Sequence, residues 1–282
     1  MDFTIALAQT DSKLGDFSAN VDTHVSYAEK ARDGGAQLVV FPELSLTGYT
    51  VRDTNWELAL RLPAKEKLQG LLKLSHDITI LAGGIEESSE FGIFNSAFLF
   101  EHGKVRSVHR KTYPPTYGMF EELRYFSRGN TMRAFDSRVG RIGVLICEDL
   151  WHVPLPYILA QDGASVIIGI AASPTRLSGT EERAEIAQVN TEHHRSYARL
   201  LSCYVVFCNR VGFEDGINFW GGSEIVGPSG EILVQAKLYE EDLIFTDIQE
   251  NELRRARRSS RHFLDDDPRV VIEELTRIYK AK

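Results

Sequence analysis

The chain has 282 residues, of which 43% are hydrophobic and 26% are charged, and its formal net charge is −8. This composition is typical of a globular protein and excludes a disordered chain, a collagen-like fibre and a coiled coil. The acidic balance argues against general binding to a nucleic acid. The sequence starts without a basic and apolar leader, and its apolar runs are far shorter than the ~20 residues of a membrane span. These features predict a cytoplasmic protein that is not attached to a membrane and keeps its cysteines reduced.

Strand-like and helix-like segments alternate along the sequence. The expected elements are a strand at 3–9, a helix at 18–34, a strand at 37–44, a helix at 64–76, strands at 78–84, 94–101 and 104–111, a strand at 141–147, a helix at 152–161, a strand at 164–173, a helix at 180–202, a strand at 204–212, a hairpin at 224–236 and a strand at 243–248. Because no Pro/Ser/Gly-rich linker interrupts them, we expect one domain over residues 1–282, with mixed sheets covered by helices.

Three strand ends carry side chains that packing alone does not require. Glu43 follows a buried Val-Val-Phe run, Lys111 precedes a Pro-Pro loop rich in aromatic residues, and Cys147 stands in a strand–turn–helix setting similar in logic to a nucleophile elbow. Each has an ordinary interpretation when taken alone: a turn cap, a surface lysine and a small buried hydrophobe. Together they could act as a base, a positive charge for an oxyanion and a nucleophile.

The remaining cysteines and a histidine pair lack such flanks. Cys203 and Cys208 are therefore predicted to be core residues, and their spacing does not suggest a zinc site. We expect His193 and His194, within the helix at 180–202, to lie on the surface or at an interface.

The order Phe-Pro-Glu43, Lys111, Cys147-Glu-Asp resembles the nitrilase superfamily of carbon–nitrogen hydrolases, and the resemblance runs over nearly the whole chain. It implies an α/β fold of nitrilase type, a four-layer α-β-β-α sandwich. It also implies a Glu–Lys–Cys triad in which Glu43 is the base, Cys147 the nucleophile, and Lys111 with the backbone N–H of Glu148 the oxyanion site. A second glutamate is expected after the lysine in a Phe-x-Glu context, which points to Glu122. This chemistry requires no cofactor and no metal.

The segments CEDLW (147–151), KTYPPTYGMFEELRYF (111–126) and ASPTR (172–176) are similar to the glutamine-amidase domain of glutamine-dependent NAD synthetases. This resemblance implies substrate contacts from Tyr117 and Ser173, and we also expect Glu148 and Trp151, in the same segments, to contact the substrate. Arg176 could pair with a substrate carboxylate. In such synthetases an ATP-dependent domain with a Ser-Gly-Gly-x-Asp-Ser loop is fused to this one. This sequence has no such loop, so we expect a stand-alone amidase or a subunit that delivers ammonia to a separate synthetase.

The expected reaction is hydrolysis of a primary amide, glutamine-like or another small carboxamide, through a cysteine thioester that releases ammonia. N-carbamoyl hydrolysis and nitrile hydrolysis are alternatives, since the same triad could serve them. A non-catalytic scaffold is the alternative from another class. The resemblance implies a homodimer or a larger homo-oligomer, with the helix at 180–202 as a candidate surface. The arginine-rich stretch at 252–263 is interpreted as a solvated helix or one side of a subunit interface rather than a nucleic-acid site.

Overall fold

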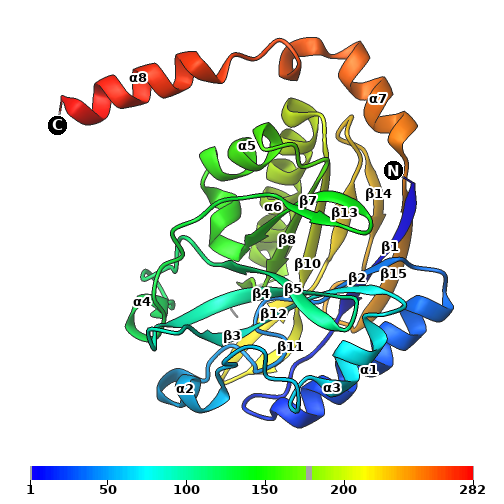
Figure 1. The fold of residues 1–282 in the computed structure, drawn as a ribbon, viewed down its shortest axis with the longest axis vertical. Helices are drawn as coiled ribbons and strands as arrows, with labels where there is room; N and C mark the ends of the chain where they lie inside the picture. Colours follow the sequence, from blue (N-terminus) through cyan, green and yellow to red (C-terminus); the bar gives the residue numbers. More distant parts are fainter. Residues whose placement is uncertain (1, 176–179, 282) are drawn as a thin grey trace.

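Alternating buried strands and helices build two six-stranded sheets, which pack face to face in the computed structural model of residues 2–175 and 180–281 (Figure 1). The first sheet has the order β15-β1-β2-β3-β4-β5, from β1 (Phe3–Gln9), β2 (Leu38–Val40), β3 (Thr79–Glu87), β4 (Ile93–Glu101), β5 (Lys104–Arg110) and β15 (Asp242–Ile248). The second has the order β14-β13-β10-β8-β7-β6, from β6 (Phe135–Ser137), β7 (Gly140–Ile146), β8 (Val166–Ala171), β10 (Tyr204–Asn209), β13 (Glu224–Val226) and β14 (Ile232–Gln235).

Helices cover the outer faces of both sheets. The helices are α1 (Phe17–Asp33), α2 (Asn55–Leu58), α3 (Gln69–Leu74), α4 (Glu122–Tyr125), α5 (Pro154–Gln161), α6 (Thr180–Leu201), α7 (Glu250–Ser259) and α8 (Pro268–Lys280), with short 3-10 turns at η1 (Arg52–Thr54), η2 (Cys147–Trp151) and η3 (Arg261–Phe263). Apolar residues of α1 and α3 form a core with the first sheet, and those of α5 and α6 form another with the second. A third core lies between the sheets. These layers confirm the expected four-layer sandwich.

Local sequence signals explain where the first of these helices begins and ends. Asp16 caps α1, because its carboxylate accepts a hydrogen bond from the backbone N–H of Ala19 at 3.0 Å. The last turn carries Lys30 and Arg32, whose charges suit the negative end of the helix dipole, and Gly34 follows the helix. Ala28 and Ala31 are fully buried against the first sheet.

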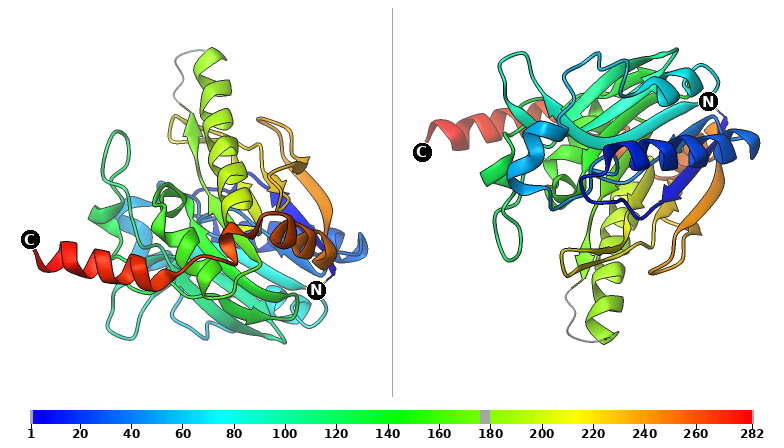
Figure 2. Two further views of the ribbon diagram at one scale, coloured as in Figure 1. Left: turned by 90° about the horizontal axis from the view of Figure 1, so that it is seen from above. Right: turned by 90° about the horizontal axis from the view of Figure 1, so that it is seen from below.

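Several expectations about the elements need correction. The predicted helix at 64–76 is wrong in extent, because only Gln69–Leu74 is helical and the charged residues before it lie in turns. A small third sheet of β9 (Pro174–Thr175), β11 (Val211–Glu214) and β12 (Ile217–Trp220) was not predicted. The arginine-rich stretch forms a solvated helix, α7, in which Leu253 and Ala256 are buried. The helix α8 lies apart from the two sheets in Figure 1, and its C-terminal end extends beyond them in Figure 2. No helix in the described part of the chain is long and apolar enough to cross a membrane.

Candidate active site

The strand directions bring the three predicted strand-end residues to one edge of the sandwich. β1, β2 and β3 run parallel, and β5 regains their direction after the antiparallel β4. In the second sheet β7, β8 and β10 are parallel to one another. Glu43 follows β2, Lys111 follows β5 and Cys147 follows β7. The carboxyl ends of strands are where open α/β sheets usually place their sites.

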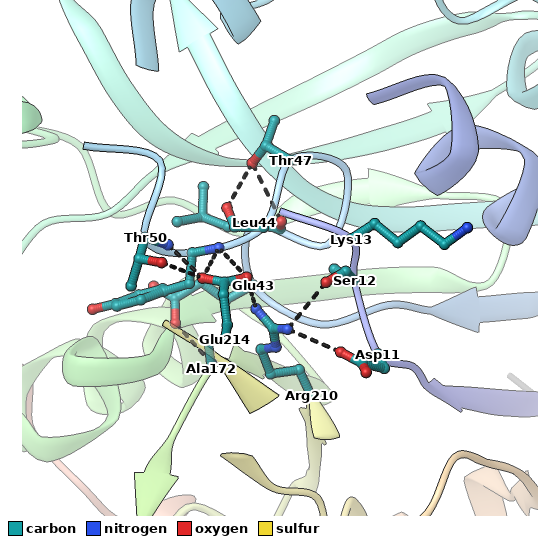
Figure 3. A network of polar contacts seen from close by, with 12 residues as sticks. Asp11, Ser12, Lys13, Glu43, Leu44, Thr47, Thr50, Ala172, Arg210 and Glu214 are labelled. Atoms are coloured by element: carbon teal, nitrogen blue, oxygen red, sulfur yellow. Dashed lines mark hydrogen bonds and ion pairs between the residues drawn. The ribbon is translucent and has the colours of Figure 1, made fainter. Parts of the chain in front are cut away.

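Lys111 lies between two carboxylates. Its Nζ donates to Glu43 Oε1 and to Glu122 Oε1, each at 2.7 Å, and all three residues are buried. Glu43 also accepts hydrogen bonds from Asn95 Nδ2 at 2.7 Å and from the backbone N–H of Ala172 at 2.8 Å, the latter drawn in Figure 3. A buried ammonium between two such carboxylates is held in one position and has no access to bulk water.

The charges of this group depend on one another. Burial disfavours the ammonium of Lys111, but Glu122 and Glu43 outweigh it and hold the pKa of Lys111 well above its usual value. Burial raises the pKa of Glu122 to about 7, against the opposing effect of Lys111. Burial, followed by the charge of Glu43, raises the pKa of the Cys147 thiol well above its usual value. The resting thiol is therefore protonated and needs a base before it can act as a nucleophile.

Cys147 occupies a strained turn at the start of η2. Its φ is +48°, in the left-handed region that a residue with a Cβ seldom adopts. The turn is held by the buried Asp149, whose carboxylate accepts from the backbone N–H groups of Ile146 at 3.2 Å, Thr112 at 3.1 Å and Tyr113 at 2.9 Å. Asp149 thus connects the turn at Cys147 to the loop that follows Lys111.

A cleft of about 390 Å³ opens above Cys147, and Tyr117, Glu148, Trp151 and Ser173 all contribute to its wall. The Tyr117 hydroxyl donates to Glu148 Oε2 at 2.8 Å. Ser173 Oγ accepts from the indole N–H of Trp220 at 3.1 Å. The structure therefore brings these four predicted substrate-binding residues together around the thiol. Arg176 lies outside the described residues.

Sequence reasoning missed the residues that hold this group in place. Tyr49 donates to Glu122 Oε1 at 2.6 Å, and Asn95 and Asp149 make the bonds described above. Asn209 accepts from the backbone N–H of Ser173 at 2.8 Å. Asn95 lies within a predicted strand, and Tyr49 stands in a loop. A signal for Asn209 was its position at the end of a buried strand, like that of Glu43.

The prediction for His194 was wrong. The residue is buried, and its Nδ1 lies 2.7 Å from Glu224 Oε1. It belongs to the inward stripe of α6, where Asn190, His194 and Ala198 follow one another at intervals of four residues. Cys203 and Cys208 are fully buried in the core, as predicted.

Comparison with known proteins shows the family of this chain. The family model described as carbon–nitrogen hydrolase matches residues 4–258. The chain belongs to this family. Proteins similar to this carbon–nitrogen hydrolase include the glutamine-dependent NAD(+) synthetase of Acinetobacter baylyi, which is 30% identical over 99% of this chain and 49% of its own length. The glutamine-dependent NAD+ synthetase of Acinetobacter baumannii, solved with adenosine diphosphate, has a TM-score of 0.78 and 29% identity over 90% of this chain and 47% of that one.

A carbon–nitrogen hydrolase from Helicobacter pylori G27 matches over 98% of this chain and 99% of its own, with a TM-score of 0.88 and 24% identity. That likeness concerns the fold, which is of nitrilase type. The chain spans about half the length of the curated synthetases it matches.

Proposed function

We propose that this carbon–nitrogen hydrolase cleaves a primary amide and releases ammonia through a thioester on Cys147. The observation that carries the proposal is the buried Lys111 ammonium, hydrogen-bonded to Glu43 and Glu122 beside a thiol that faces a cleft. A fixed cation next to a nucleophile suits a reaction in which negative charge develops on a carbonyl oxygen.

In the first half of the reaction Glu43 takes the proton of the Cys147 thiol, and the sulfur attacks the amide carbon. The C=O electron pair moves to oxygen, and Lys111 Nζ with the backbone N–H of Glu148 stabilises the oxyanion. Glu43 then gives its proton to the amide nitrogen. The C–N bond breaks, ammonia leaves and a thioester remains on Cys147.

In the second half water attacks the thioester while Glu43 accepts one of its protons. The tetrahedral intermediate collapses, the C–S bond breaks and the carboxylic acid leaves, with the proton returned to the thiol. Glu122 remains on Lys111 through both halves and keeps the ammonium in place. Tyr117, Trp151 and Ser173 form the wall against which the acyl group rests.

Glutamine is the first candidate substrate, because synthetases similar to this chain are named for their dependence on it. We propose that the ammonia is passed to a synthetase domain or subunit, since this chain matches only about half of those proteins. We also propose that two copies associate, as the family resemblance implies.

The experiment that tests the function is ammonia release from L-glutamine, other small primary amides, an N-carbamoyl amino acid and a nitrile. Cys147→Ala should abolish release, and intact mass spectrometry should detect an acyl adduct on the wild type alone. Cys203→Ala is the matched control, because that thiol is buried away from the cleft. Activity that survives Cys147→Ala would overturn the mechanism. If only the carbamoyl compound or only the nitrile is hydrolysed, the substrate belongs to that class and the proposal of a primary amide is wrong.

A further inference from the structure

Arg210 and Glu214 form a buried ion pair next to the candidate site but outside its cleft. Arg210 Nη1 and Glu214 Oε2 are 2.7 Å apart, and their side chains are only 1% and 2% exposed. Bringing two charges out of water is costly, and a buried pair commonly adds little net stability over an apolar one. The bonds that this pair makes to other segments therefore indicate what it does.

Glu214 accepts hydrogen bonds from one short piece of the loop that follows Glu43. The backbone N–H of Tyr49 donates to Glu214 Oε1 at 2.9 Å. The backbone N–H and the hydroxyl of Thr50 donate to the same oxygen at 2.5 and 2.9 Å (Figure 3). Gly48 permits this approach: its φ is +81°, and a Cβ there would lie 2.9 Å from Glu214 Oε2.

Arg210 anchors the other end of the pair. Its Nη2 donates to Asp11 Oδ1 at 3.1 Å and to the backbone carbonyl of Ser12 at 3.2 Å, as Figure 3 shows. Its guanidinium also lies over the ring of Phe219, 4.3 Å from the centroid. Arg210 thus fixes the carboxylate of Glu214, which in turn binds the backbone N–H groups of Tyr49 and Thr50.

The loop bound by Glu214 places the side chain of Tyr49 in the candidate site. The ring of Tyr49 packs edge-on against that of Phe219, with 5.9 Å between the ring centroids. The Tyr49 hydroxyl donates to Glu122 Oε1 at 2.6 Å. The same Glu122 oxygen accepts from Lys111 Nζ. A continuous chain of contacts therefore runs from Arg210 through Glu214, Tyr49 and Glu122 to Lys111.

We propose that Arg210 and Glu214 are positioning residues, which hold the Tyr49 hydroxyl on Glu122 and thereby fix Lys111 beside Cys147. Neither touches the cleft, so each acts through Tyr49. The positioning of Tyr49 is a statement about the fold, whereas its effect on turnover rests on the proposed amide hydrolysis.

Glu122 faces charged or titratable groups from three directions. Lys111 follows β5, Glu43 and Tyr49 belong to the loop after β2, and Cys147 begins η2. The hydrogen bond from Tyr49 favours the ionised form of Glu122 and lowers its pKa. Loss of that bond should therefore move the titration of Glu122 to higher pH.

The test compares Glu214→Gln with Asp215→Asn. Asp215 is the matched control, because it pairs with Arg52 at 2.7 Å and joins the same two segments on the exposed surface. Glu214→Gln should weaken the hydrogen-exchange protection of the Tyr49 and Thr50 amides. It should lower kcat by about 10- to 100-fold, as small misplacements of catalytic groups do, with a smaller change in KM. Asp215→Asn should change neither readout.

Tyr49→Phe tests the same chain of contacts without disturbing the buried pair. It should lower kcat by about tenfold, through loss of one hydrogen bond to a charged group, and move the acidic limb of kcat/KM to higher pH. If Glu214 acts through Tyr49, the double variant should lose much less than the product of the two single losses. Fully multiplicative losses would overturn the proposal.

Two readouts separate this inference from the proposed function. Alkylation of Cys147 by iodoacetamide needs no turnover, and its pH dependence should shift in Tyr49→Phe because Glu122 acts on the thiol. If the wild type releases no ammonia while amide protection and the alkylation profile change as stated, the proposed function fails and the positioning stands. If wild-type turnover is present and Glu214→Gln keeps wild-type protection and kcat, the positioning is refuted. Should Glu214→Gln fail to fold, Tyr49→Phe decides: an unchanged kcat and alkylation profile refute the inference.

Discussion

Replacing Lys111 by Met would show how strongly the site depends on its buried cation. The variant keeps a side chain of similar length but leaves the Glu43 and Glu122 carboxylates without their shared donor. Removing one partner of a buried ion pair commonly costs about 3–5 kcal/mol of the free energy of unfolding. For a chain of this size that corresponds to a fall in Tm of roughly 10 °C.

The loss of unfolding free energy in Lys111→Met should depend on pH, and the pKa of Glu122 determines whether the loss grows or shrinks as pH rises. Burial raises the pKa of Glu122 to about 7, above its value of 4.5 in an unfolded chain. A group with a raised pKa in the folded state gives its full stability below the unfolded value and loses it as pH rises through the folded one. Without the ammonium of Lys111 that pKa rises further, so Lys111→Met should be closest to the wild type at pH 5 and furthest from it at pH 8.

Thermal melts at one scan rate, recorded at pH 5, 6, 7 and 8, would measure the effect. Lys237→Met is the matched control, because its ion pair with Glu240 is exposed and such pairs contribute little. A Lys111→Met protein that melts with the wild type at pH 8 would refute the reasoning. So would an equal loss at pH 5 and pH 8.

Three further predictions concern single features of the site. The wild-type kcat/KM should rise with pH around an apparent midpoint near 7, because Glu122 must be ionised to hold the ammonium; a flat stopped-assay profile from pH 5 to 9 would contradict this. Gly83→Ala should sharply reduce both soluble yield and activity, because a Cβ there would overlap the backbone of the segment 42–44, whereas Gly84→Ala meets only side chains at 3.2 Å and should be milder. Asp149→Ala removes the hydrogen bonds that hold the turn at Cys147 and should lower kcat by about 100-fold. A single-turnover rate equal to that of the wild type would contradict this prediction.

Local pattern predicted mixed sheets covered by helices and singled out three residues at strand ends, whereas the four-layer arrangement and Glu122 were implied by the family resemblance. Glu43, Lys111 and Cys147 each follow a strand, and strands that run in the same direction bring such residues to one edge. The residues that hold them depend on partners far along the chain. Glu214 accepts a hydrogen bond from Tyr49, which lies 165 residues away in the sequence. Ala172 donates to Glu43 over a separation of 129 residues. No spacing in the sequence encodes such pairs.

The extent of α3 was mispredicted for a related reason. Leu68, Leu71 and Leu74 pack into the core over less than two helical turns, and the preceding charged residues gain nothing from a longer helix. The burial of His194 was missed because its partner, Glu224, lies 30 residues further along the chain, on β13. In both cases tertiary contacts decided what local propensity left open.

The hydrogen bond between Ala172 and Glu43 joins the two halves of the sandwich at the proposed catalytic base. One sheet supplies the carboxylate and the other supplies the donor, along with the thiol that follows β7. A nascent chain that has formed only β1–β5, the part of the first sheet that precedes the second sheet in sequence, therefore contains the proposed base but not the proposed nucleophile. Chemical competence should appear only after the second sheet has docked, so a chain released early from the ribosome would be inert rather than partly active. The rate at which Cys147 acquires its native reactivity during refolding would then report the last long-range step of assembly.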